Sequence, residues 1–202
     1  MISAGHCYTE LGNSYSTLNS VTSSGAWNPI GSVVWSSVGT SGTITGRHGD
    51  LSISIMSGSN ATQGYVYVGT YDTSNSRHVI GRVSLPEGWK GSNVYPSGAG
   101  PAVGNGTGQV LLDWISLVNQ TVTYSNSNQT ITNLSFGENA STCVGSGDSG
   151  GAVYQENGTS DAYAVGIISG TNNQGGLFTN CRNYFTPIGY VATDWGGSIK
   201  TL

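Results

Sequence analysis

The sequence predicts an all-β fold, and three observations carry that prediction. Short runs rich in Val, Ile, Tyr and Thr alternate with Gly, Ser and Asn along the 202 residues, as strands separated by turns do. Residues 50–56 alternate cleanly, with Leu51, Ile53 and Ile55 on one face and serines on the other. Helical spacing occurs in one plausible segment near the C-terminus. We therefore expect a β-rich chain that ends in one short helix.

Taken in order, the apolar runs place strands between turn-forming clusters. The expected strands cover residues 30–38, 50–56, 65–71, 77–85, 109–118, 131–136 and 163–169. Between the fourth and fifth of these, residues 95–109 are rich in glycine and contain two prolines. Such a segment predicts a long turn or connector.

The expected helix lies at the C-terminal end. Pro187 suits a first helical position, and Ile188, Val191, Ala192 and Trp195 follow i, i+3, i+4, i+7 spacing. Two glycines, at 196 and 197, follow directly and are expected to end the helix.

The composition excludes several classes of partner. Charged residues make up 8% of the chain, against about 25% in ordinary domains. The net charge of −4 argues against nucleic acid and anionic membranes, which both require a basic patch. Seven Asn-x-Ser/Thr sequons, which suit a secreted glycoprotein, begin at residues 60, 105, 119, 128, 133, 139 and 157.

The cysteines are three in number: Cys7, Cys143 and Cys181. An odd count in a secreted chain indicates either an external partner or a missing one. None of the spacings fits C-x-x-C or another zinc pattern. We therefore expect neither a metal site nor a cofactor.

The stretch GDSGG surrounds Ser149 with glycines, which permit positive φ values and close backbone approach. The N–H groups of Gly147 and Ser149 are placed to converge on one point, as an oxyanion hole requires. Asp148 would be a costly buried charge unless it locks that turn. The structural alternative is a glycine-rich surface turn without chemistry.

Chain order distinguishes between the hydrolase classes. GDSGG also satisfies G-x-S-x-G, but the α/β-hydrolase elbow needs a histidine after the serine. All three histidines, His6, His48 and His78, precede Ser149. The order His, Asp, Ser remains, in the segments ISAGHC, HGDLSISI and GSGDSGG. With these three motifs the chain resembles the chymotrypsin-like serine endopeptidases, in particular the streptogrisin and α-lytic type.

This resemblance implies two antiparallel six-stranded β-barrels with a short C-terminal helix. Residues 1–70 would form the remainder of an incomplete first barrel, which carries the histidine and aspartate. Residues 71–202 would form the second barrel and the helix, with the nucleophile, the oxyanion hole and the specificity pocket.

The family roles transfer residue by residue. His6 would be the general base, Asp50 would orient it, and Ser149 would attack the scissile carbonyl to form an acyl-enzyme. The oxyanion would be received by the amides of Gly147 and Ser149, and Ser169 would support the aspartate. Asp72 competes with Asp50 for its role, whereas His48 and His78 are expected on the surface or in local pairs.

The resemblance also implies a substrate pocket, which it places at Cys143, Val144, Ile168, Ser169, Gly170 and Thr171. A disulfide between Cys143 and Cys181 would brace it, the alternative being two free thiols in a cytosolic protein. The pocket walls hold no aspartate, Ile168 replaces the histidine of glutamate-specific relatives, and Thr171 narrows a position often held by glycine. We therefore expect apolar specificity on polypeptide substrates, in a monomer.

In the family, two strands precede the catalytic histidine, and a cysteine on the second bonds to the cysteine after that histidine. This sequence starts one strand-end before His6, so Cys7 is expected to lack its partner. On this interpretation a signal peptide and propeptide are absent from the sequence and the protein is extracellular. The alternative is a non-catalytic relative that acts as a binding module. The family partners of Asp148, an arginine or a freed N-terminus, are not evident.

Overall fold

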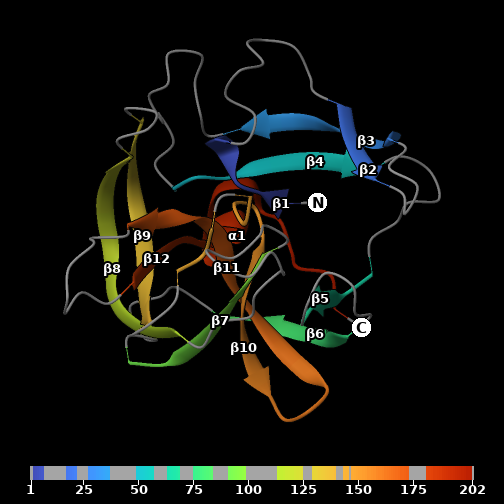
Figure 1. Ribbon diagram of the computed structural model, residues 1–202. Helices are drawn as coiled ribbons and strands as arrows, with labels where there is room; N and C mark the ends of the chain where they lie inside the picture. The colour runs from blue at the N-terminus through green and yellow to red at the C-terminus, as the bar shows by residue number, and fades with distance from the viewer. Residues whose placement is uncertain are drawn as a thin grey trace.

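The structure is a computed structural model of the whole chain. It describes residues 2–6, 17–21, 27–36, 49–56, 63–68, 75–83, 91–98, 113–124, 129–139, 143–145, 147–172 and 181–201. Two β-sheets and one short helix make up the described chain, with the first sheet above the second in Figure 1.

The first sheet contains the four N-terminal strands, β1 (Ile2–Ser3), β2 (Thr17–Val21), β3 (Trp27–Ser36) and β4 (Ser52–Met56). Their order across the sheet is β1-β4-β3-β2, and each pairing is antiparallel. The short β1 pairs with β4 at Ile2–Ile53 and Ser3–Ser52. This register decides which residues after β1 face those before β4.

The second sheet contains eight strands in the order β10-β7-β8-β9-β12-β11-β6-β5. They are β5 (Tyr65–Tyr67), β6 (Ser76–Arg82), β7 (Asn93–Ser97), β8 (Asp113–Tyr124), β9 (Gln129–Asn139), β10 (Ala152–Asn157), β11 (Asp161–Asn172) and β12 (Cys181–Pro187). β10 also pairs with β11, so the pairings lead around six strands and back to β10. All pairings are antiparallel except β6–β11, which is parallel.

The interior of the second sheet is filled mainly by aliphatic side chains. One cluster of buried residues consists of Val83, Val94, Ile115, Val144, Val153, Val165, Ile168 and Phe185. A second cluster, Ile131, Leu134, Phe136 and Tyr184, fills the space beside β8 and β9.

A separate apolar cluster joins the two sheets. Ala4 and Leu51, from the first sheet's end, pack against Ile167 of β11 and against Ile188, Tyr190 and Val191 at the C-terminus. The helix α1 (Gly189–Trp195) contributes the last two of these. α1 therefore lies at the junction of the sheets (Figure 1), next to the segments that carry the predicted catalytic residues.

The all-β class with a short terminal helix is confirmed, with two corrections to the expected elements. Pro187 ends β12 instead of opening the helix, which starts at Gly189; a proline is tolerated at a strand end because no ladder N–H is needed there. Residues 95–97 belong to β7, although the sequence predicted a turn. Pairing of β7 with β10 and β8 overrides the local turn signal.

The chain passes from the first sheet to the second between β4 and β5. β5 ends at Tyr67 and pairs within the second sheet, so the change falls between Met56 and Tyr65. The division into two folding units stays a prediction. The described residues include no helix long and apolar enough to cross a membrane.

Replacing Phe185 with alanine is expected to lower the free energy of unfolding by about 3–5 kcal/mol. The ring is 1% exposed and lies within the main core cluster, so its removal leaves a cavity that the β-sheet cannot collapse to fill. Urea unfolding followed by tryptophan fluorescence measures the change.

Thr121→Ala is the matched control, because Thr121 is exposed on β8 and should change stability by less than about 0.5 kcal/mol. A Phe185→Ala protein as stable as this control would contradict the assigned core.

Candidate active site

The pairing of β1 with β4 brings His6 to Asp50. Ser3 faces Ser52 in the antiparallel register, so the residues after Ser3 run alongside those just before Ser52. The imidazole Nδ1 of His6 contacts the Asp50 carboxylate at Oδ2. The backbone N–H of His6 donates to the other carboxylate oxygen, Oδ1, at 2.7 Å. Asp50 therefore holds both the ring and the main chain of His6.

Asp50 is fully buried, so its charge requires donors from the protein. Besides His6, the hydroxyl of Ser169 on β11 donates to Oδ2 at 2.7 Å. The backbone of Asp50 is fixed by Thr186 of β12, whose hydroxyl accepts from the Asp50 N–H at 2.9 Å. The aspartate of the first sheet is thus held by two strands of the second.

Ser149 lies in a tight turn that packs against the chain before His6. Gly150 has φ = 88°, a left-handed conformation that favours glycine, and a Cβ there would meet the Ser3 hydroxyl. The Gly150 N–H donates to the carbonyl of Ile168 at 2.9 Å. The Ser149 hydroxyl donates to the carbonyl of Ser169 at 3.1 Å. The same β11 segment therefore contacts the turn of Ser149 and the carboxylate of Asp50.

Asp148 is buried beside Ser149, with 2% of its surface exposed. Its Oδ2 accepts a hydrogen bond from the N–H of Gly145 at 2.7 Å. The sequence suggested no partner, since an arginine or a free N-terminus was expected. The structure supplies a backbone donor from three residues earlier, so this carboxylate locks the turn locally.

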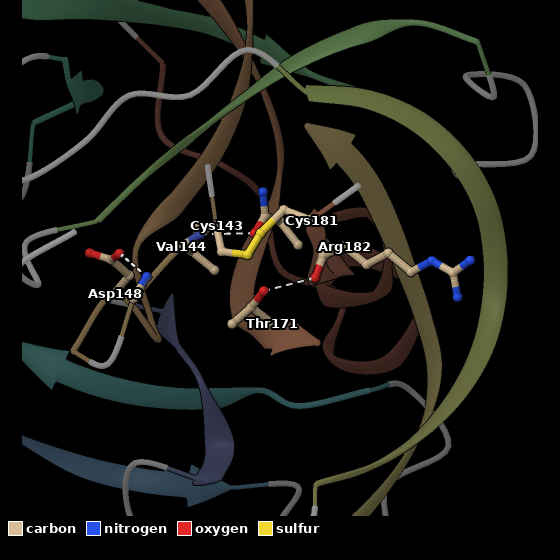
Figure 2. Close-up of a disulfide and its surroundings, with 8 residues drawn as sticks. Cys143, Val144, Asp148, Thr171, Cys181 and Arg182 are labelled. Atoms are coloured by element: carbon tan, nitrogen blue, oxygen red, sulfur yellow. Dashed lines mark hydrogen bonds between the residues drawn. A yellow bond between two sulfur atoms is a disulfide. The ribbon is translucent and has the colours of Figure 1, made fainter. Parts of the chain in front are cut away.

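A disulfide joins Cys143 and Cys181, as the resemblance implied, and links the segment before Ser149 to the start of β12 (Figure 2). Next to it, the N–H of Val144 donates to Oδ1 of Asn183 at 2.9 Å. The Thr171 hydroxyl donates to the carbonyl of Arg182 at 3.0 Å. These contacts hold three segments of the expected pocket together: the one before the nucleophile, the end of β11 and the start of β12.

The six expected pocket residues differ in how they are placed. Four of them are buried: Cys143, Val144, Ile168 and Ser169. Val144 and Ile168 pack into the main core cluster. Only Gly170 and Thr171 are partly exposed. The pocket assignment stays a prediction, in which Val144 and Ile168 can act only through their backbones.

Several other sequence predictions have a clear outcome. His78 lies on the surface of β6, where its Nδ1 is 3.7 Å from the Asp161 carboxylate. Cys7, His48 and Asp72 lie outside the described residues. Sequence reasoning missed the contacts of Thr186 with Asp50 and of Tyr124, whose hydroxyl donates to the Ser169 hydroxyl at 3.2 Å. Both residues lie in ordinary strand patterns that give no local signal. Within the described part of the chain, no cluster of three or more His, Cys, Asp or Glu residues could hold a metal ion.

Comparisons with known proteins agree with this architecture. No family model matches the sequence, and no curated protein does. Among solved structures, the chain is similar to a glutamic acid-specific serine protease with a TM-score of 0.63 at 21% identity, over 98% of this chain and 84% of that one. It is also similar to Cellulomonas bogoriensis chymotrypsin (TM-score 0.63, 23% identity, 100% and 85%).

A third similar structure is Thermobifida fusca protease A, with a TM-score of 0.61 at 22% identity over 100% of this chain and 84% of the other. At such identities the similarity establishes the fold. The predicted chymotrypsin-like protease fold is therefore confirmed.

Replacing both Cys143 and Cys181 with alanine is expected to lower the free energy of unfolding by about 3–4 kcal/mol. The disulfide spans a sequence separation of 38 residues, and its loss releases that loop in the unfolded chain. Urea unfolding with and without reductant measures the effect.

Reductant provides the internal control for this prediction. It should destabilise the wild-type chain by about the same amount and leave the double variant nearly unchanged. Equal sensitivity of both proteins to reductant would contradict the assigned role of this disulfide.

Proposed function

We propose that this protein is a serine endopeptidase that hydrolyses peptide bonds through an acyl-enzyme. The observation that carries the proposal is that Asp50, which holds His6, and Ser149 both form hydrogen bonds with Ser169. One segment of β11 joins them, because Ser169 donates to Asp50 through its hydroxyl and accepts from Ser149 through its carbonyl. The confirmed fold is that of known serine proteases, which supports the same function.

His6 would act as the general base. Its Nδ1 is engaged by Asp50, so Nε2, on the far side of the ring, is the atom for proton transfer. A buried carboxylate at Nδ1 fixes the tautomer and stabilises the imidazolium that forms when Ser149 loses its proton. The Ser149 hydroxyl would rotate from the Ser169 carbonyl towards His6 when it attacks the substrate. His6 then returns the proton to the leaving amine.

The oxyanion would be received by the N–H groups of Gly147 and Ser149. Gly147 has φ = 93°, and this left-handed conformation turns its peptide within the loop that Asp148 locks. Hydrogen bonds to such backbone donors strengthen as negative charge develops on the substrate oxygen. The local bond from Gly145 to Asp148 supports a loop already formed before substrate binds.

We infer an apolar primary specificity. The described pocket segments contain neither an aspartate in the walls nor a histidine, and the chain's three histidines lie at 6, 48 and 78. The similar glutamic acid-specific protease uses a histidine triad in substrate binding, which this arrangement does not reproduce. Arg182 points away from Thr171 and the disulfide (Figure 2), towards Glu138.

We further propose that the protein acts outside the cell as a monomer on polypeptide substrates. The disulfide, the seven sequons and the low charge all suit an oxidising, extracellular environment. Nucleic acid and membranes are not expected partners, and the proposed chemistry uses no metal or cofactor.

A fluorophosphonate probe is expected to modify Ser149, as detected by peptide mass spectrometry. His6→Ala should slow the labelling about a thousandfold or more, because the hydroxyl loses its base, and Ser149→Ala should abolish it. Ser76→Ala, at an exposed serine of β6, is the matched control and should leave labelling unchanged.

Two results would count against the proposal. Labelling that survives Ser149→Ala would place the reactive serine elsewhere. A folded chain that is not labelled at all would favour the alternative, a non-catalytic binding module with this fold.

Peptide-library cleavage is expected mainly after apolar residues of small to medium size. Thr171→Gly should raise the relative kcat/KM for substrates with Phe or Tyr before the cleaved bond, because glycine would leave more room than threonine in the proposed pocket. Cleavage mainly after Arg, Lys or Glu in the wild-type protein would overturn the proposed specificity.

A further inference from the structure

A β-bulge sets Ser169 apart from its neighbours on β11. In the pairing with β12, Ile168 faces Phe185 and Gly170 faces Tyr184, so the register shifts at the residue between them. An extra residue of this kind is left out of the ladder and points in a new direction. Ser169 uses that freedom to donate to Asp50 at 2.7 Å.

Tyr124 reaches the same bulge from another strand. It is the last residue of β8, and its hydroxyl donates to the hydroxyl oxygen of Ser169 at 3.2 Å. Its ring lies over Gly170, where a Cβ would come within 2.9 Å of the ring carbon Cε1 and of the phenol oxygen. The missing side chain at Gly170 is what lets the tyrosine approach. The contact is therefore built into two strands.

Two hydroxyl groups and one carboxylate form a chain of hydrogen bonds that runs in one direction. Tyr124 donates to Ser169, and Ser169 donates to Asp50, which holds His6. A serine hydroxyl has one proton, so a donor that occupies its oxygen leaves that proton for the carboxylate. Successive donors in a low-dielectric interior also polarise one another.

We infer that Tyr124 is a positioning residue of the proposed active site, which fixes the direction of the Ser169 hydroxyl and thereby the charge that Asp50 presents to His6. The inference rests on the proposed function but concerns a residue outside the triad. Burial raises the pKa of the Tyr124 hydroxyl above its usual range, so the group stays protonated and remains a donor near neutral pH. The titratable groups that face this hydroxyl include Asp50 and Tyr184.

Loss of the Tyr124 hydroxyl is expected to make the His6 imidazole harder to deprotonate. Without the phenol hydroxyl, Ser169 is free to turn its proton away from Asp50. The carboxylate then carries a less neutralised charge and stabilises the imidazolium form of His6 more strongly. Neutral His6, the form that can accept the Ser149 proton, is then reached only at higher pH.

The decisive variant is Tyr124→Phe, which keeps the ring over Gly170 and removes only the hydroxyl. Two measurements are made on the full-length protein: the pH dependence of fluorophosphonate labelling at Ser149, and an NMR titration of the His6 imidazole. In the variant, the acid limb of the labelling rate and the His6 midpoint should both move to higher pH. Below the wild-type midpoint, labelling should fall by about two- to tenfold.

Tyr154→Phe is the matched control, because Tyr154 is a buried tyrosine of β10 whose ring stacks on Tyr95 of β7. It should leave the His6 midpoint in place. In a Ser169→Ala background, Tyr124→Phe should cause no further shift, because the link between the two groups is already cut.

The outcomes separate the inference from the proposed function. An unshifted His6 midpoint in Tyr124→Phe, or an equal shift in Tyr154→Phe, would overturn the role of Tyr124. Absence of wild-type labelling would overturn the proposed protease activity, while the NMR titration would still decide whether Tyr124 acts on His6.

Discussion

The carboxylate of Asp50 is fully buried where the two sheets meet, and an unpaired charge in that position would cost several kcal/mol. The first sheet satisfies it with the ring and backbone N–H of His6. The second sheet adds the Ser169 hydroxyl. Neither sheet alone provides all of these donors, so the charge is stable only when the sheets are correctly docked.

The apolar contacts at the same junction favour the same docking. Ala4 lies close to His6 in the sequence and Leu51 follows Asp50. Both pack against Ile167 and against a group of residues near the C-terminus: Ile188, Tyr190 and Val191. Burial of these side chains supplies non-directional attraction, whereas the hydrogen bonds to Asp50 select one relative position. The terminal helix therefore supports the junction at which His6 and Asp50 lie through the apolar side chains of Tyr190 and Val191.

The proposed catalytic residues can be picked out from the sequence more readily than the residues that hold them. His6, Asp50 and Ser149 stand in short motifs whose order excludes other hydrolase classes, and the structure brings the first two into contact. Thr186 and Tyr124 cannot be found in this way, because their roles depend on strand pairings between residues far apart in the chain.

Local patterns fail for the same reason elsewhere in the fold. Residues 95–97 look like part of a glycine- and proline-rich turn but form a strand between β8 and β10. Pro187 has the position of a helix opener and instead ends β12. In both cases the deciding energy comes from neighbouring strands, which a single-segment pattern does not contain.

The low content of charged residues is reflected in how Asp50 is held. The sequence is poor in Asp, Glu, Lys and Arg and rich in hydroxyl groups, which at first suggest only a polar surface. At the junction of the sheets, however, the Ser169 hydroxyl donates to the Asp50 carboxylate and the Tyr124 hydroxyl donates to Ser169. The Thr186 hydroxyl accepts from the backbone N–H of Asp50. A neutral donor orients the buried Asp50 carboxylate without adding a second full charge. The imidazole of His6 therefore remains the group whose positive charge the carboxylate balances.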